Sequence, residues 1–330
     1  MPVYDQSYGH WDGEFRRTHF RWLPMVRFHV SQLLKKRMVW LMLFLSFIPA
    51  IGSSIPIYIA ANQSGDSTIA LTREIGLLLE SAGILEEADS MGRGRESTNA
   101  DVSLEEVYLL AAKYFLVFFV IQFQSLAVLI ITSLVGAGLI AKDIRSNALE
   151  IYLTKPITAF DYLMGKLCVI GVFVFMVLFV PGLSLYIVAS SLWPGFFDAT
   201  YPVLLPFTLF CGLAAFVNGM VILGLSSLAK SSRYAAGIWF ALCFVTGIVG
   251  NFLFMQTYSG TLALISYRES FGGIAEWLFE TRSINELLLN PREQQLVRSA
   301  PIWMPFAILG GYVVASILIL NKTLRNLENR

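Results

Sequence analysis

The sequence predicts an all-α integral membrane protein, and three observations lead to this fold class. The 330 residues are 56% hydrophobic and only 14% charged, with a mean hydropathy of +0.64, whereas soluble domains carry about 25% charged residues. The apolar residues gather in six runs, each about long enough for a membrane-crossing helix of about 20 residues. The net charge of +1 excludes a strongly basic nucleic-acid-binding protein and an acidic disordered chain.

The first predicted element is an amphipathic helix within an amino-terminal segment, residues 1–38. Its apolar residues recur at helical spacing, and Arg27 and Lys36 fall on other faces: Trp22, Met25, Val26, Val30 and Leu33. A basic amphipathic helix of this kind lies in the membrane interface. The alternative is that these charges simply flank the first span. His29 falls on the apolar stripe, and we expect the interface merely to tolerate it.

Six transmembrane helices follow, and together they make up a single domain over 39–330. The predicted spans are 39–60, 109–141, 167–193, 203–229, 235–258 and 302–320. A polar segment precedes the first run, so this run is not a signal peptide. The second run is longer than the bilayer requires, and part of it should project beyond the lipid.

Basic residues predict that both termini are cytoplasmic. With the termini inside, 16 of the 24 basic residues but only 7 of the 23 acidic residues fall on the inner side. An excess of Lys and Arg on short inner loops sets orientation, so both termini are expected to be cytoplasmic. We expect a multi-pass protein of the cell inner (cytoplasmic) membrane. The outer segments are then 62–107 and 259–300, and the latter contains apolar stretches around 274–279 and 284–289 that are too short to span. The inner loop is 142–166.

Motifs for chemistry within this chain are absent. No phosphate-binding Gly-x4-Gly-Lys-Ser/Thr loop, no Gly-x-Ser-x-Gly elbow and no His-Glu-x-x-His helix occurs. Three single cysteines lie inside apolar runs and predict neither disulfides nor a metal site: Cys168, Cys211 and Cys243. We therefore expect no catalytic, cofactor-binding or metal-binding residues, and no enzymatic activity.

The spans are nearly free of ionisable groups, which disfavours an ion-coupled carrier because such carriers keep their relays at membrane depth. Only Lys113 lies in a run, near its outer end, where it can reach water. The neutral polar residues at depth either line a pathway or hydrogen-bond between helices: Gln122, Gln124, Asn218 and Asn251.

The inner loop predicts a short amphipathic helix over 143–154. On a helical wheel one arc is polar, with Asp143, Ser146, Asn147, Glu150 and Thr154, and the opposite arc contains Ile144, Ala148, Ile151 and Tyr152. Pro156 ends this helix, and Thr158 with Asp161 caps a new helix that runs into the third span. Such an element either docks a partner against two transmembrane helices or lies on the inner leaflet as a plain connector.

This loop resembles the signature region of the ABC-2 type permeases, the membrane subunits of ATP-binding-cassette exporters. The matching positions are Asp143, Leu149, Glu150, Pro156, Ile157, Thr158, Gly165 and Lys166. The departures are Arg145 at the second acid, Asn147 and Ala148 in place of Gly-Thr, and Ala159 in place of an arginine. The basic interfacial helix, the six spans, the cytoplasmic termini and the long outer segment between the fifth and sixth spans resemble the same family. The outer segment 62–107 resembles permeases associated with copper-enzyme maturation.

The resemblance implies a permease that moves an unknown substrate, driven by a separate ATP-binding subunit that binds ATP and Mg. The ATPase-coupling residues would be Asp143, Asn147, Glu150, Thr154, Pro156 and Thr158, with Ile144, Ile151 and Tyr152 anchoring the loop to the bundle. Two permease subunits, identical or different, would assemble in the lipid bilayer with two ATPase subunits. The alternative function is a non-transporting scaffold or mechanotransmitter that the same kind of ATPase drives.

Overall fold

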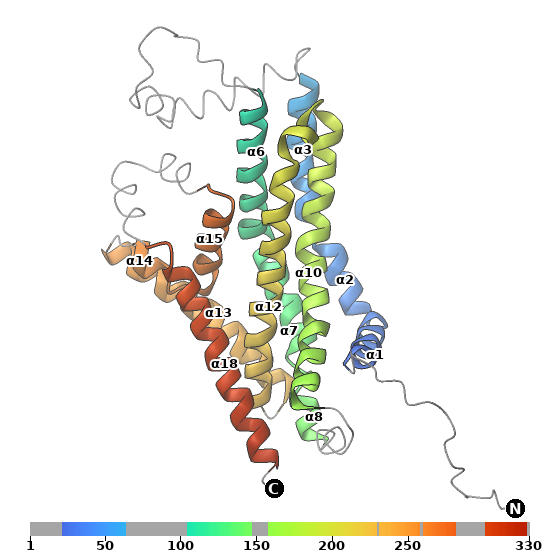
Figure 1. The fold of residues 1–330 in the computed structure, drawn as a ribbon, viewed down its shortest axis with the longest axis vertical. Coiled ribbons are helices and arrows are strands. Elements are labelled where there is room, and N and C mark those ends of the chain that lie inside the picture. The colour runs from blue at the N-terminus through green and yellow to red at the C-terminus, as the bar shows by residue number, and fades with distance from the viewer. Residues whose placement is uncertain are drawn as a thin grey trace, which may run out of the picture.

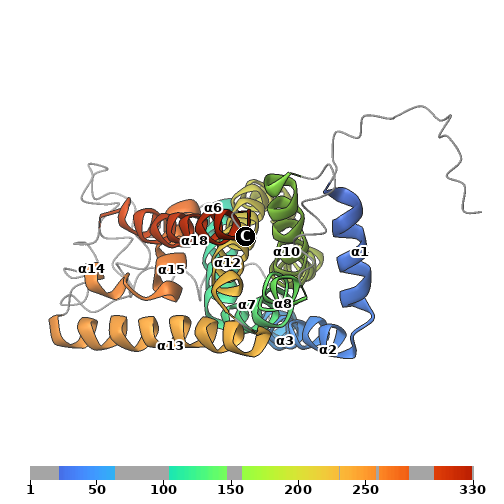
Figure 2. The ribbon, with the colours of Figure 1, turned by 90° about the horizontal axis from the view of Figure 1, so that it is seen from below.

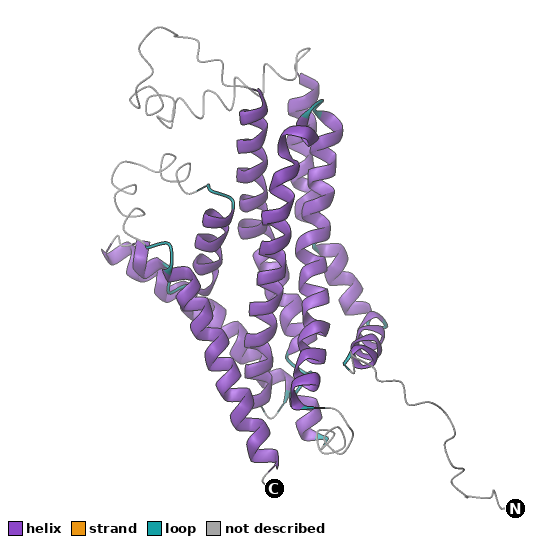
Figure 3. Cartoon of the chain, viewed as in Figure 1, coloured by secondary structure: helices purple, strands orange, loops and turns teal. Residues whose placement is uncertain are grey.

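The computed structural model describes residues 22–63, 104–146, 158–229, 231–257, 260–281 and 301–328. Every regular element in these ranges is helical (Figure 3). The elements are α1 Leu23–Leu34, α2 Arg37–Leu45, α3 Phe47–Gln63, α6 Leu104–Phe118, the π-helix η1 Phe119–Gln124, α7 Ser125–Gly136, α8 Ala141–Arg145, α10 Ala159–Leu192, α11 Phe196–Thr200, the 3-10 helix η2 Tyr201–Val203, α12 Leu204–Leu228, α13 Ser232–Thr257, α14 Gly260–Ala263, α15 Tyr267–Leu278 and α18 Met304–Glu328. The all-α membrane fold predicted from the sequence is confirmed, since six of the described helical stretches are long and apolar enough to cross a membrane.

The long helices α10 and α12 form the centre of the bundle (Figure 1). They pack against each other, α10 also packs against α3 and α7, and α12 packs against α18. Helices α13, α15 and α18 lie on one side of this centre, and α1 lies on the other (Figure 2). We name the two ends of the bundle by their short helices: the α8 end, where α18 also finishes, and the α11 end.

Helix α1 crosses the bundle axis. In Figure 2 it is seen along its length while α10 is seen nearly end-on, as expected for a helix in the membrane interface. Its buried residues are Val26 and Leu33, whereas Leu23 and Phe28 are exposed. The indole of Trp40 donates a 2.8 Å hydrogen bond to the Leu34 carbonyl, which fixes the corner between α1 and α2.

The first two spans are interrupted helices, which the apolar runs did not predict. The first span breaks at Ser46 between α2 and α3. Pro49 has no backbone N–H to donate to the carbonyl four residues earlier, and its ring would clash with that carbonyl in a regular helix. In the second span, a π-helical turn separates α6 from α7. The two interruptions lie together, since the Gln124 amide donates a 2.9 Å hydrogen bond to the Ser46 carbonyl.

The third span starts earlier than the apolar run does, with α10 beginning at Ala159. Thr158 and Asp161 form the predicted capping box: the Thr158 hydroxyl accepts from the Asp161 backbone N–H at 3.1 Å, and the Thr158 N–H donates to the Asp161 carboxylate at 3.2 Å. This cap starts a helix that continues without a break into the membrane span, as predicted.

At the α11 end, aromatic rings join α6, α10 and α11. Tyr108 stacks on Trp193 with ring centroids 6.4 Å apart, and it contacts Phe196 edge-on at 5.3 Å. Next to α6, Lys113 pairs with Glu280 at 2.8 Å, and the Lys113 ammonium lowers the pKa of that exposed carboxyl. The predicted apolar stretch around 274–279 is largely within α15, while the one around 284–289 and most of 62–107 lie outside the described residues.

Candidate coupling site at the α8 end

Only the two ends of the predicted coupling loop lie among the described residues. Helix α8 covers the start of the predicted 143–154 helix and includes Asp143 and Ile144, and Thr158 caps α10. Ile144 is half-buried and packs against the core. The other predicted coupling and anchoring residues lie outside the described residues: Asn147, Glu150, Ile151, Tyr152, Thr154 and Pro156.

Asp143 pairs with a lysine that is completely buried. The Asp143 carboxylate lies 2.7 Å from the Lys166 ammonium and accepts a 2.8 Å hydrogen bond from the Tyr162 hydroxyl. The Lys166 ammonium also lies 5.4 Å from the centre of the Tyr162 ring. A buried ammonium is strongly unfavourable unless a carboxylate compensates it, so this pair holds α8 against the start of α10.

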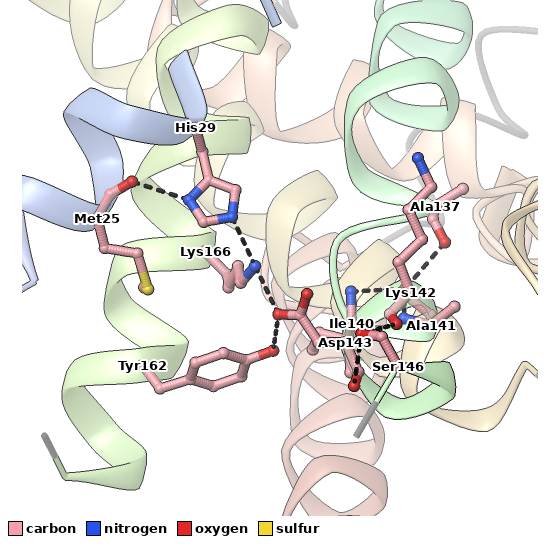
Figure 4. A network of polar contacts seen from close by, with 11 residues as sticks. Met25, His29, Ala137, Ile140, Ala141, Lys142, Asp143, Ser146, Tyr162 and Lys166 are labelled. Atoms are coloured by element: carbon pink, nitrogen blue, oxygen red, sulfur yellow. Dashed lines mark hydrogen bonds and ion pairs between the residues drawn. The ribbon is translucent and has the colours of Figure 1, made fainter. Parts of the chain in front are cut away.

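His29 brings the interfacial helix α1 into the same cluster (Figure 4). Its Nδ1 lies 2.8 Å from the Met25 carbonyl, which can only accept, so Nδ1 carries the proton. Nε2 is then free to accept from the Lys166 ammonium at 3.0 Å. Burial and the nearby Lys166 charge both lower the pKa of His29 below its ordinary value, which keeps the ring neutral. We call His29, Asp143, Tyr162 and Lys166 the Lys166 cluster.

Gly165 and Lys166 of α10 both lie against α1. A Cβ at Gly165 would lie 2.1 Å from the Met25 Cε, which is the end of a flexible side chain, and 3.5 Å from the Trp22 Cβ, which is an ordinary contact distance. The glycine therefore leaves room for the Met25 side chain, and the lysine bonds to His29 of α1.

Ser226 of α12 holds the turn between α7 and α8. Its hydroxyl accepts from the backbone N–H groups of Ile140 at 3.2 Å and Ala141 at 3.0 Å, and donates to the Ala137 carbonyl at 2.9 Å. These three backbone groups lie where the second span leaves its helical path, and Figure 4 shows them beside the Lys166 cluster. The start of the coupling loop is thus fixed both to α10 and to α12.

Three residues of this site have larger roles than the sequence predicts. His29 is predicted merely to be tolerated in the membrane interface. Lys166 is predicted only as a basic residue of the inner loop and a match to the family signature, and nothing is predicted for Ser226. The spacing of Thr158, Asp161 and the Gly165-Lys166 pair was the available signal for a fixed helix start. No sequence signal indicated that residues so distant in the chain meet.

The neutral polar residues of the spans have two kinds of surroundings, and Asn218 has both. Gln124 bonds between helices, as described above. Asn218 donates to the Ala214 carbonyl of its own helix and accepts from the Tyr267 hydroxyl at 3.2 Å. Gln122, Asn218 and Asn251 line a cavity, and Gln124 is not one of its lining residues. That any of them lines a transport pathway stays a prediction.

The fold and this site define a multi-pass helical membrane protein with a braced loop between its second and third spans. Residues 26–320 match the model of the ABC-2 family transporter protein family, and the chain belongs to that family. It is therefore a membrane permease subunit of an ABC transporter, a class that associates with an ATP-binding subunit. No curated protein matches the sequence. The resemblance to permeases of copper-enzyme maturation stays a prediction.

Proposed function

We propose that this chain is the permease subunit of an exporter and that a separate ATP-binding subunit docks beneath the 142–166 loop. ATP and Mg bind to that partner, and this chain contributes no catalytic residue. Both termini and the α8 end then face the cytoplasm, in the cell inner membrane, and two permease halves assemble with two ATPase subunits.

The observation that supports this proposal is the bracing of the loop by the Lys166 cluster. Asp143 lies near one end of the loop and Lys166 at the other, and they are 2.7 Å apart. His29 extends the cluster to α1. A push on the loop therefore reaches α8, α10 and the interfacial helix together, which a loosely attached connector would not transmit.

The test is reversal of charge on the loop at Glu150, the acid that matches the family signature. If the loop docks on the ATPase, Glu150→Arg should leave the permease folded and inserted but weaken ATPase co-purification and abolish coupled turnover. Truncating a buried interfacial charge pair costs about 2–5 kcal/mol, whereas a solvated surface change costs less than about 0.5 kcal/mol. Pro156→Ala should cause related damage, because the two loop helices could merge.

Ser146→Ala provides the matched control on the same loop. Among the described residues, the Ser146 hydroxyl bonds to the backbone carbonyls of Lys142 at 2.9 Å and Asp143 at 3.5 Å, so its loss should be mild. Wild-type ATPase stoichiometry and normal turnover in Glu150→Arg would remove Glu150 from the docking surface. The permease purified alone should neither bind nor hydrolyse ATP. Magnesium-dependent ATP hydrolysis by the permease itself would contradict the proposal that ATP binds only to the partner subunit.

A further inference from the structure

A cavity of about 1050 Å³ lies between the second span, α12, α13 and α15. Pockets for drug-sized ligands occupy about 300–1,000 Å³ and combine apolar walls with a few polar groups. This cavity is therefore large enough for a ligand of that size.

Apolar side chains form one wall of the cavity. Leu126 and Leu129 of α7 line it together with Phe244 and Ile248 of α13. Leu126, Phe244 and Ile248 are also each more than half exposed in the described chain. This accessible apolar wall suits an acyl chain.

Charged side chains gather on α15, at the opposite wall. Arg268, Glu269 and Glu276 all line the cavity. The Arg268 guanidinium donates to the Ile121 carbonyl at 3.3 Å and to the Gln122 side-chain oxygen. Both acceptors are uncharged, so neither neutralises the guanidinium charge.

The elements that form this wall are held by close packing. A Cβ on Gly273 would lie 2.7 Å from the Pro305 ring, and one on Gly250 would lie 2.9 Å from the Ala263 carbonyl. α15 is thereby pressed against α18, and the turn before it against α13. The π-helical turn η1 supplies Val120, Ile121 and Gln122 to the same cavity, and π-turns of this kind are frequent at functional sites.

We propose that this cavity binds a zwitterionic phospholipid-type amphiphile, with its chain along α7 and α13 and its head group against α15. The phosphate pairs with Arg268, since guanidinium groups bind phosphate through charge-assisted hydrogen bonds. The ammonium group lies toward Glu269, which lines the same wall. A purely anionic head would meet this carboxylate next to Arg268, which makes it the weaker ligand. We also infer that such an amphiphile is the transported substrate. That second step rests on the proposed function, whereas the binding site does not.

Trp239 gives a direct readout, because it lines the cavity and its side chain is fully buried. Purified protein is placed in phosphatidylcholine vesicles containing increasing fractions of lipid brominated at the middle of its chains. The Trp239 contribution to tryptophan quenching is obtained by comparison with Trp239→Phe. We expect Trp239, which lines the cavity, to be quenched more strongly in the wild type than in the cavity-blocking variant described below. Equal Trp239 emission in brominated and plain vesicles would overturn the site.

Two glycines of α13 form the matched pair for blocking the cavity. Gly247 lines it, with only the Ser266 hydroxyl at 4.0 Å from a new Cβ, while Gly237 has open space and does not line it. Gly247→Leu should abolish Trp239 quenching and Gly237→Leu should retain it. Equal quenching in the two variants would show that the lipid does not occupy the cavity.

The head group is tested at Arg268. Arg268→Gln should weaken binding of brominated phosphatidylcholine about tenfold, as loss of a charge-assisted hydrogen bond predicts, and Arg268→Lys should retain most of it. Stronger Trp239 quenching by brominated phosphatidylglycerol than by the choline lipid would overturn the zwitterionic assignment.

The binding site and the proposed function are tested by different measurements. In the assembled complex, Gly247→Leu should lower the ATPase rate several-fold without changing ATPase co-purification. If Gly247→Leu loses Trp239 quenching but keeps an unchanged ATPase rate, the amphiphile is not the transported substrate. If wild-type protein recruits no ATPase but Trp239 is still quenched, the proposed function fails and the binding site remains.

Discussion

Lys166 is the residue on which the geometry of the α8 end depends. It is completely buried, yet its ammonium has a carboxylate, an imidazole nitrogen and an aromatic ring around it. Those partners come from α8, α1 and α10, so a single side chain bonds three elements. A hydrophobic residue in its place could fill the space but could not fix these directions.

Removing the carboxylate should cost more than removing the whole pair. Asp143→Ala leaves the Lys166 charge buried without compensation, and we expect a loss of about 3–5 kcal/mol. The double variant Asp143→Leu with Lys166→Met should recover most of that loss, because replacing a buried pair by apolar groups is often nearly neutral. Denaturant unfolding of the detergent-purified protein measures both. Additive losses in the double variant would show that the two groups do not compensate each other.

His29 should make α1 docking sensitive to mild acid. Burial and the adjacent Lys166 charge lower its folded-state pKa, while Asp143 opposes this, and the unfolded value is about 6.5. Because the folded state binds this proton less readily than the unfolded state, the neutral ring contributes fully above about pH 6.5. That contribution is lost as the pH falls from 6.5 toward the folded pKa.

Thermal unfolding across this pH window tests the effect against His29→Gln. The glutamine amide can accept from Lys166 but does not titrate. We expect the acid-side decrease in stability to be smaller in His29→Gln than in the wild type. Identical pH profiles would mean that His29 does not report on the cluster.

Among the elements, the turn between α7 and α8 is the one most dependent on a distant side chain. The N–H groups of Ile140 and Ala141 are in buried residues, and Ser226 accepts from both. A helix start needs such acceptors, since its first N–H groups have no partner within the helix. The start of the 142–166 loop is therefore set by α12 rather than by local sequence.

Ser226→Ala should destabilise this turn by about 1–3 kcal/mol for each donor left unsatisfied. The neighbouring Ser227→Ala is the control, because the Ser227 hydroxyl bonds to Gly224 of its own helix at 2.7 Å. Amide hydrogen exchange over 137–146 should accelerate in the Ser226 variant and remain unchanged in the Ser227 variant. Unchanged exchange in both would leave the turn without dependence on α12.

The whole molecule is asymmetric around the α10–α12 centre. On one side α1 crosses the axis, and on the other α13 is scarcely buried and borders the cavity. This arrangement places the Lys166 cluster at the α8 end and the cavity beside α13. The 16-to-8 division of basic residues in the sequence predicts that the α8 end is cytoplasmic.

Cysteine labelling decides this orientation. With the three native cysteines replaced by alanine, Ser90→Cys should react with an impermeant maleimide in intact cells, and Arg325→Cys should react only after permeabilisation. Positive residues on short inner loops provide the physical reason. If Arg325→Cys is labelled in intact cells and Ser90→Cys is not, the orientation in the membrane is the reverse of the predicted one.

The sequence by itself determined the features that depend on neighbouring residues. Apolar runs predicted six spans because bilayer thickness sets their length, and the spacing of Thr158 and Asp161 predicted the start of α10 because a capping box is local. The periodic apolar residues ahead of residue 39 predicted the interfacial helix α1 for the same reason.

Only the tertiary structure decided the contacts between residues far apart in the chain. The burial of Lys166, its bond to His29, the acceptor role of Ser226 and the meeting of Gln124 with the break at Ser46 all depend on which helices pack together. A hydropathy pattern records how apolar a segment is but not which neighbour faces it, because transmembrane helices pack through close-fitting contacts and hydrogen bonds rather than through a difference in apolarity. The cavity follows from the same packing, since its walls come from separate helices.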